Sequence, residues 1–339
     1  MKQLHKGTQT ILFDESPVIL SSAAIGGKKE AEGPLAGFFD YTSKDTKFGQ
    51  STWEKAESRL QELALDTAKR KLNAQYKDID VLFAGDLLNQ CIGSSFALRD
   101  TKIPFLGLYG ACSTMAESLM LAAAGVNAGY AKIAAALTSS HFASAERQYR
   151  FPLGYGGQRT PNAQWTVTGA GCCIVGSEGS DISIKAATVG HIEDLGIKDA
   201  NNMGAAMAPA AVSTLLAHFN DLGCSPADYD LIVTGDLGVL GKKIVTEQLL
   251  KNGLDLTQNY DDCGCMIFDR DRQDVHAGGS GCGCSASVLC GYLLRQIKEG
   301  KLRRLLFCAT GALLSPVSTW QGESIPGICH ALTIVKEGA

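Results

Sequence analysis

Cys112 lies in the segment of this sequence that is best suited to nucleophilic chemistry. The apolar run 105–109 ends at Gly110-Ala111-Cys112-Ser113, and a helical pattern follows over 114–128. A short turn of small residues between a strand and a helix places this thiol at the helix N-terminus, where unpaired N–H groups and the helix dipole stabilise a thiolate. Such a turn exposes a nucleophile and holds it rigidly. The alternative is a buried cysteine that packs the turn.

Two histidines could serve as the base that such a thiol requires. His141 follows the strand-like run 133–138, and His276 precedes the glycine-rich turn 278–284. Histidine exchanges a proton near neutral pH, so both are candidates for a general base or a ligand contact. Structural roles are more common for single histidines, but their mirrored places in the chain favour a cluster with Cys112.

The segment 142–168 concentrates arginine and aromatic side chains. Its candidates for ligand contact are Arg147, Arg150, Gln158 and Arg159, accompanied by Tyr149, Phe151, Tyr155 and Trp165. Guanidinium groups pair with carboxylates through two hydrogen bonds, and aromatic rings stack on planar ligands. The combination suits a small aromatic or dicarboxylate anion and predicts a long functional loop rather than a packed element. A subunit interface explains the same residues equally well.

The chain of 339 residues contains twelve cysteines. Their apolar surroundings predict reduced thiols that pack as small core residues. Cys263-Gly264-Cys265 and Cys282-Gly283-Cys284 could together form a four-thiolate metal site. The one-residue spacing is tighter than that of zinc sites, and the glycines fit turns as well, so we predict no metal.

The elements that must position these residues fall into two similar halves. The sequence Asp80-Val81-Leu82-Phe83-Ala84-Gly85-Asp86-Leu87 has a counterpart 150 positions later, Asp230-Leu231-Ile232-Val233-Thr234-Gly235-Asp236-Leu237. Self-similarity of this kind indicates a duplicated α/β unit, with halves at 1–178 and 179–339. Strand-like runs alternate with helical patterns in each half, which predicts a mostly parallel sheet in each.

Composition and charge exclude several classes of function. The net charge of −4 gives no basic surface for nucleic acid. Hydrophobic residues make up 45% of the chain, which favours a large core over disorder. The alanine-rich stretch 115–137 is interrupted by Glu117 and Lys132, so it predicts a buried helix and a strand rather than a membrane span. Residues 1–12 lack a signal-peptide core, so we expect synthesis in the cytoplasm.

The duplicated halves and the cysteine turn resemble the thiolase and ketoacyl-synthase superfamily. Gly110-Ala111-Cys112-Ser113 resembles the active-site cysteine turn of that superfamily, and His276-Ala277-Gly278-Gly279-Ser280-Gly281 resembles its second-half histidine turn. The resemblance implies a five-layered α/β/α/β/α fold and a homodimer formed through the first half.

A longer match is specific to one family of this superfamily. Thr138-Ser139-Ser140-His141, Ala145-Glu146-Arg147-Gln148-Tyr149-Arg150-Phe151-Pro152-Leu153 and Gln164-Trp165-Thr166-Val167-Thr168-Gly169 are similar to the stage V sporulation protein AD family. The resemblance implies binding of dipicolinic acid (pyridine-2,6-dicarboxylate) for uptake into the developing spore. It also implies membrane-protein partners from the same stage V sporulation A operon and a peripheral position at the spore inner membrane. No cofactor is implied, with calcium present only as part of a dipicolinate chelate.

Two departures from the condensing enzymes argue against catalysis. Where type-III ketoacyl synthases carry His-Gln-Ala-Asn, this chain has Thr234-Gly235-Asp236-Leu237-Gly238, and Gly281-Cys282-Gly283-Cys284 replaces their asparagine turn. Condensation needs a base or an oxyanion donor from those positions. We interpret Asp236, like Asp86 in the first half, as a structural mark of the duplication.

We therefore predict a non-catalytic binding protein whose former active-site pocket holds dipicolinate. The predicted ligand contacts are Cys112, Ser140, His141, Arg147, Arg150, Gln158, Arg159 and His276. The rival hypothesis is an acyl-transferring enzyme with Cys112 as nucleophile and His276 as base. A third hypothesis is a purely structural subunit of a membrane complex, with no small-molecule ligand.

Overall fold

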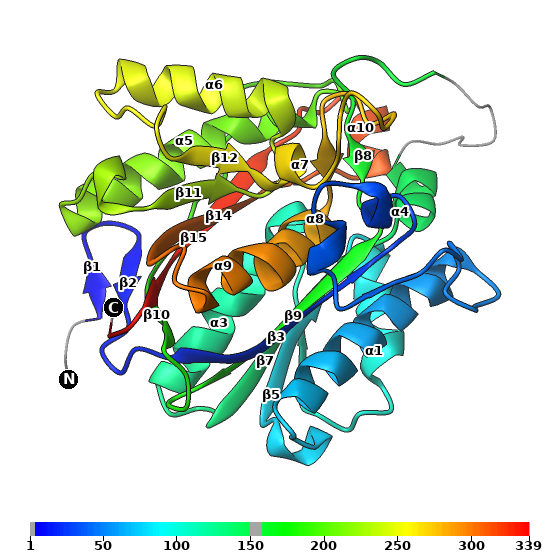
Figure 1. Cartoon of the computed structure of the whole chain (residues 1–339). Helices are drawn as coiled ribbons and strands as arrows, with labels where there is room; N and C mark the ends of the chain where they lie inside the picture. Colours follow the sequence, from blue (N-terminus) through cyan, green and yellow to red (C-terminus); the bar gives the residue numbers. More distant parts are fainter. Residues whose placement is uncertain (1–3, 150–157, 339) are drawn as a thin grey trace.

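The computed structural model describes residues 4–149 and 158–338. Most of its strands belong to one sheet, in which the same strand arrangement occurs twice (Figure 1). The first run consists, in spatial order, of β3 (Val18–Gly26), β9 (Gly169–Gly176), β7 (Ile133–Ser140), β5 (Val81–Gly85) and β6 (Phe105–Gly107). The second consists of β10 (Ile182–Thr188), β15 (Gly327–Lys336), β14 (Arg304–Ala312), β11 (Leu231–Thr234) and β12 (Tyr260–Asp262).

The two runs also share their pattern of strand directions. In each, the first two pairings are antiparallel and the last two are parallel. The predicted duplication is confirmed, but the prediction of a mostly parallel sheet in each half is wrong. β9 returns beside β7 without a helical crossover over the sheet, and such a neighbour runs antiparallel.

Helices cover both outer faces and fill the space between the two runs. The outer helices are α1 (Trp53–Lys71) and α2 (Ile92–Leu98) on the first half, and α5 (Met203–Leu222) and α6 (Gly238–Lys251) on the second. The middle layer consists of α3 (Thr114–Asn127), α8 (Cys282–Ser287), a π-helix (Val288–Leu293) and α9 (Leu294–Lys298). Three buried apolar clusters follow this layering, and Figure 1 shows α5 and α6 on one side and α1 on the other.

Local sequence explains why the outer helices form where they do. Thr52 caps α1 by accepting from the Lys55 N–H at 3.3 Å. Ala56, Leu60 and Ala64 recur at helical spacing and are fully buried against the sheet. The outer layer is thus fixed by capping together with one apolar stripe.

The predicted loop 142–168 is partly wrong, because two of its parts are regular elements. Residues Phe142–Tyr149 form helix α4, and β8 (Trp165–Thr166) pairs in parallel with β13 (Gly279–Ser280). Ala145 is buried, so α4 packs on the molecule instead of extending from it. Residues 150–157 lie outside the described part of the chain.

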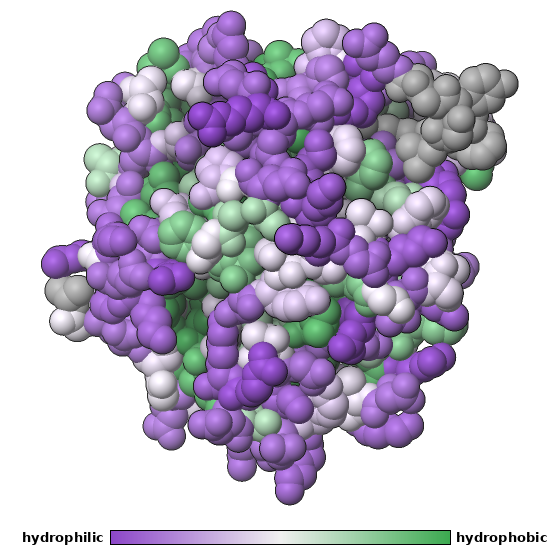
Figure 2. Space-filling view, turned by 45° about the vertical axis from the view of Figure 1, so that its right-hand side comes forward, coloured by the Kyte–Doolittle hydropathy of each residue, from purple (hydrophilic) through white to green (hydrophobic). Residues whose placement is uncertain are grey.

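The remaining elements are short. They are β1 (His5–Lys6), β2 (Thr10–Leu12), β4 (Tyr41–Thr42), α7 (Cys263–Met266), α10 (Pro316–Trp320) and the 3₁₀ turns Glu30–Glu32, Ala36–Phe38, Tyr76–Asp78, Asn89–Cys91, Ala111–Ser113 and Pro226–Asp228. Within residues 4–149 and 158–338, none of the helices has the length and apolarity needed to cross a membrane. Hydrophilic side chains cover most of the face in Figure 2, with smaller hydrophobic areas between them.

Candidate functional site

Cys112 lies in a tight turn between β6 and α3. Ala111 has a φ of 51°, a left-handed conformation that residues other than glycine seldom adopt. The Ser113 hydroxyl donates to the Gly110 carbonyl at 2.7 Å, and the Thr114 hydroxyl donates to the Ala111 carbonyl at 2.6 Å. The turn predicted from the sequence is therefore present, and these bonds hold Cys112 at the start of α3.

The Cys112 side chain lines a cavity between the two halves of the chain. The interior of the cavity that is accessible to water is about 40 Å³, which is smaller than most small-molecule sites, and its open mouth brings the total empty space to about 440 Å³. Its lining residues are Leu87, Tyr109, Ala111, Cys112, Ala145, Glu146, Tyr149, Thr166, Met203, Ser280, Ala312 and Leu314. This described lining contains neither lysine nor arginine, and Glu146 is its carboxylic acid.

Hydroxyl groups form the polar part of the cavity wall. The hydroxyls of Tyr109 and Tyr149 lie within hydrogen-bond distance of each other and of the Leu87 carbonyl, so one phenol donates to that carbonyl while the other donates to the first phenol. The Thr166 hydroxyl donates to the Glu146 carboxylate at 2.9 Å. Burial raises the pKa of Tyr109 to about 12, so this phenol stays protonated at physiological pH. These groups can hydrogen-bond a small polar ligand.

Asp236 is the acidic residue that contacts Cys112 from the second half. Its carboxylate accepts from the Gly281 N–H and from the Thr310 hydroxyl, each at 2.9 Å, and its negative charge acts on the Cys112 thiol. Burial raises the pKa of this carboxyl to about 6. The interpretation of Asp236 as a structural mark only is therefore incomplete. Its place in the position of His-Gln-Ala-Asn was the sequence signal that could have identified it as part of the site.

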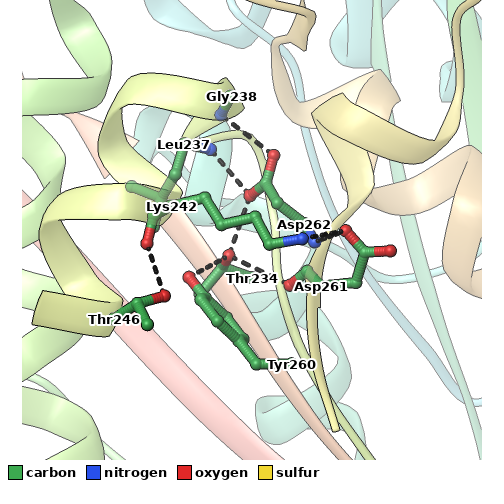
Figure 3. A network of polar contacts seen from close by, with 8 residues as sticks. All are labelled: Thr234, Leu237, Gly238, Lys242, Thr246, Tyr260, Asp261 and Asp262. Carbon is green, nitrogen blue, oxygen red and sulfur yellow. Dashed lines mark hydrogen bonds and ion pairs between the residues drawn. The ribbon is translucent and has the colours of Figure 1, made fainter. Parts of the chain in front are cut away.

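A buried carboxylate network fixes the turn that carries Asp236 (Figure 3). Asp262 accepts from the backbone N–H groups of Leu237 and Gly238, each at 2.9 Å, and from the Thr234 hydroxyl at 2.8 Å. Burial raises the pKa of Asp262 to about 7. Thr234 lies two residues before Asp236, and Leu237 directly follows it. Because Asp262 bonds to both of these residues, it holds the backbone around Asp236 in place.

Of the two interpretations of Cys112, a stabilised thiolate or a buried packing cysteine, the surroundings of the thiol favour the second. Burial raises the pKa of the Cys112 thiol well above its usual value, and the negative charge of Asp236 raises it further. The N-terminus of α3 does not offset these two effects. Both effects favour the protonated thiol of Cys112.

Ser140 and His141 are buried behind the cavity and bonded to the backbone. The Ser140 hydroxyl donates to the Val167 carbonyl at 2.7 Å and accepts from the Gly283 N–H at 3.0 Å. His141 Nε2 lies 2.7 Å from the Thr46 carbonyl, and burial lowers the pKa of its imidazole. Both residues connect segments of the scaffold.

His276 and Arg159 meet at Asp274, away from the cavity lining. His276 Nε2 and Arg159 Nη2 both lie 3.1 Å from the Asp274 carboxylate. The Arg159 guanidinium also lies over the Trp165 ring, 4.7 Å from its centroid, and Phe142 stacks on that ring at 3.8 Å. These contacts connect α4, β8 and the turn before β13.

The other predicted contacts lie elsewhere. Arg147 forms an ion pair with Glu54, and its guanidinium lies 5.5 Å from the centroid of the Trp53 ring. Gln158 is exposed, and Arg150 lies outside the described residues. Of the described candidates, Cys112 alone lines the cavity, and the role of the others in ligand binding stays a prediction.

Solved structures of two enzymes share this fold. The human mitochondrial 3-ketoacyl-CoA thiolase matches with a TM-score of 0.59 at 12% identity, over 96% of this chain and 99% of that one. The 3-oxoacyl-(acyl-carrier-protein) synthase III of Aquifex aeolicus VF5 matches with a TM-score of 0.58 at 12% identity, over 94% of this chain and 100% of that one. The molecule therefore has a thiolase-like fold, and the prediction of that fold is confirmed.

Sequence comparison gives the family within this fold. The sequence profile described as Stage V sporulation protein AD (SpoVAD) matches residues 7–335. Stage V sporulation protein AD of Bacillus subtilis (strain 168) is 47% identical over 332 residues, which cover 98% of each chain. The chain belongs to the stage V sporulation protein AD family, as its sequence motifs predicted.

Proposed function

We propose that the Cys112 cavity binds dipicolinate without catalysis, for uptake of this ligand into the developing spore. The observation that carries the proposal is that the Cys112 thiol lines the cavity but is buried and close to the Asp236 carboxylate. A thiol held in its protonated form is a poor nucleophile, whereas it can still donate to a ligand. Membership of a sporulation family and the position of Cys112 in the wall of a cavity also support the proposal.

The charge of the cavity limits how a dicarboxylate can bind. Glu146 lines it and Asp236 lies behind Cys112, so a bare dianion would be repelled. Calcium would remove this repulsion if dipicolinate enters as its chelate. Arg150 directly follows Tyr149 in the sequence and is the other predicted source of positive charge, but it lies outside the described residues.

Calorimetric titration of the purified protein with dipicolinate, with and without calcium, tests the proposal. Pyridine-3,5-dicarboxylate serves as the control ligand, because it has the same charge but cannot chelate between its carboxylates and ring nitrogen. We expect saturable binding of dipicolinate alone, weakened in Cys112→Ala. Equal binding of both isomers, or no heat from folded protein with either, would contradict the proposal.

The second candidate function is acyl transfer from a coenzyme A thioester to Cys112. The retained turn, with the left-handed Ala111 before Cys112, favours it, as does the enzyme fold. Against it, the predicted base His276 is bonded to Asp274 and is not part of the cavity lining. Incubation with acetyl-coenzyme A and intact-mass analysis decides the matter, since an enzyme of this kind gains an acetyl group that Cys112→Ala lacks.

We also propose that the protein forms a homodimer through β6. This strand lies at one end of the sheet order, so one of its edges has no partner strand within the described chain. Several large apolar side chains near that edge are exposed: Ile92, Phe96, Leu106 and Tyr109. An unpaired strand beside exposed apolar groups favours association with a second copy.

Recruitment to the spore inner membrane is proposed to depend on membrane-protein partners of the same operon. Two exposed apolar side chains, Val317 and Trp320, lie on α10, which closely follows Leu314 of the cavity lining. A partner that contacts α10 would therefore be next to the ligand. In a pelleting assay with lipid vesicles and no partner we expect the protein in the supernatant, and strong sedimentation with the vesicles would contradict this proposal.

A further inference from the structure

A pair of thiols from the two halves of the chain meets at a place unrelated to the Cys112 cavity. Cys173 lies on β9 and Cys290 lies in the π-helix Val288–Leu293, and their sulfur atoms are 3.5 Å apart. The two residues are 117 positions apart in the sequence. Both are buried in the apolar cluster of the middle layer. Their contact joins the two halves of the duplicated fold.

The backbone around Cys290 is held firmly in this position. Its carbonyl accepts a hydrogen bond from the Ser22 hydroxyl on β3 at 2.9 Å. A Cβ atom on the next residue, Gly291, would lie 2.8 Å from the Phe38 carbonyl oxygen, so only glycine permits this close approach. The π-helix is thus fixed against β3 and directs Cys290 toward β9. Such one-turn irregularities in helices are frequent at functional positions.

A groove separate from the Cys112 cavity gives access to one of the two residues. It holds about 1500 Å³ of empty space, counted with its open side, and Cys290 is among its lining residues. Neighbours of Cys290 in that lining include Ser22, Lys71 and Leu294. Cys290 is 4% exposed and Cys173 is 0% exposed. A small reagent in the groove therefore reaches Cys290 before Cys173.

We propose that Cys173 and Cys290 are a disulfide-forming site that links the two halves when the protein meets hydrogen peroxide. The Cys290 thiol attacks one peroxide oxygen, which gives a sulfenic acid and one water. The Cys173 thiol then attacks the oxidised sulfur, which forms the S–S bond and releases a second water. The two thiols lose two electrons in total, and the peroxide takes them up.

Two physical consequences follow from this site. Burial raises the pKa of the Cys290 thiol well above its usual value, so the reactive thiolate is scarce at neutral pH and oxidation accelerates as the pH rises. A cross-link across a long stretch of chain restricts the unfolded state. For a domain of this size we expect the melting temperature to rise by about 5 °C on oxidation.

The test treats the full chain with hydrogen peroxide at pH 8.5, alkylates the remaining thiols in denaturant and maps the peptides. We expect a peptide pair linked through Cys173 and Cys290 in the wild type. Cys172→Ala is the matched control, because Cys172 is equally buried on the same strand but belongs to the cluster on the opposite face of the sheet. The link persists in that control and is lost in Cys290→Ala.

The peptide map of the peroxide-treated wild type tests the proposed link without any variant, so the result does not depend on how well the variants fold. Alkylation of both cysteines after peroxide treatment, at a dose that oxidises exposed thiols, would overturn the proposal. So would a link from Cys290 to Cys172 in place of Cys173. The rise in melting temperature should be reversed by dithiothreitol and absent in Cys290→Ala, and a rise that persists in that variant also contradicts the site.

Discussion

At the scale of single residues, burial and the charge of Asp236 together determine the chemical state of Cys112. A thiolase-like turn presents the thiol at a helix N-terminus, which by itself favours ionisation. Here the thiol is buried and lies beside a carboxylate, and both effects keep its proton on. The same turn can therefore serve a binding site, because burial of the thiol and a neighbouring carboxylate together disfavour the thiolate.

Asp236→Asn should make Cys112 more reactive. Removing the negative charge lowers the thiol pKa, and each unit of that decrease raises the thiolate fraction about tenfold below the pKa. We expect iodoacetamide to modify Cys112 about tenfold faster in this variant than in the wild type at pH 8. Mass spectrometry of the peptide that contains Cys112 measures the rate. The control is Asp86→Asn, the equivalent residue of the first half, whose charge is not among the causes of the Cys112 shift. Equal rates in both variants would contradict this role of Asp236.

Glu30 makes stability depend on pH. Its carboxylate accepts from the Thr168 N–H at 3.0 Å, and burial raises its pKa from 4.5 to about 7. A raised pKa means that the stabilising contribution is complete below pH 4.5 and is lost as the pH rises through 7. Between pH 5 and pH 8 the wild type should lose about 2.5 kcal/mol of unfolding free energy relative to Glu30→Gln.

Urea unfolding of both proteins at the two pH values measures this difference. Glu30→Gln keeps an acceptor for the Thr168 N–H, so its own pH dependence reports all other groups. An identical pH dependence of the two proteins would show that Glu30 titrates as an ordinary exposed carboxyl.

At the scale of elements, the site depends on how closely β14 approaches the cysteine turn. A Cβ atom on Gly311 of β14 would lie 2.3 Å from the Gly110 carbonyl oxygen, so Gly311→Ala must displace one of the two segments. We expect a loss of about 1 to 3 kcal/mol in stability and weaker dipicolinate binding. Gly37→Ala is the control, because no atom lies within 4 Å of its Cβ position. Melting curves and calorimetry of the two variants check both expectations.

The elements show where sequence patterns were informative and where they were not. The small-residue stretch around Cys112 and the helical pattern after it are local, so α3 was predicted at nearly its observed place. Helix α4 was missed because Arg147 and Tyr149 suggested a loop, whereas its buried side is set by contacts with distant residues. The role of Asp236 was missed for the same reason, since its contact with Cys112 exists only after the two halves have packed.

At the scale of the whole molecule, the duplicated sheet leaves one end available for association. The end strand of the sheet in the first half is β6, and the end strand in the second half is β12. Leu106 of β6 is 47% exposed. Tyr109 directly follows this edge, is 41% exposed and also lines the cavity. A partner subunit at β6 would therefore cover part of the molecule that is continuous with the ligand site, so dimerisation and binding should be coupled.

Leu106→Glu should separate the dimer and weaken dipicolinate binding together. The new charge would lie in an apolar interface, where burying it without a partner is strongly unfavourable. Light scattering should give twice the chain mass of 35.8 kDa for the wild type and the single chain mass for the variant. Leu195→Glu is the control, because Leu195 is 73% exposed in the second half, between β10 and α5, and this variant should stay dimeric with unchanged affinity. A wild type that is monomeric at tens of micromolar would contradict the proposed dimer. A Leu106→Glu variant that is monomeric but binds dipicolinate with full affinity would be consistent with the dimer and would contradict its coupling to the cavity.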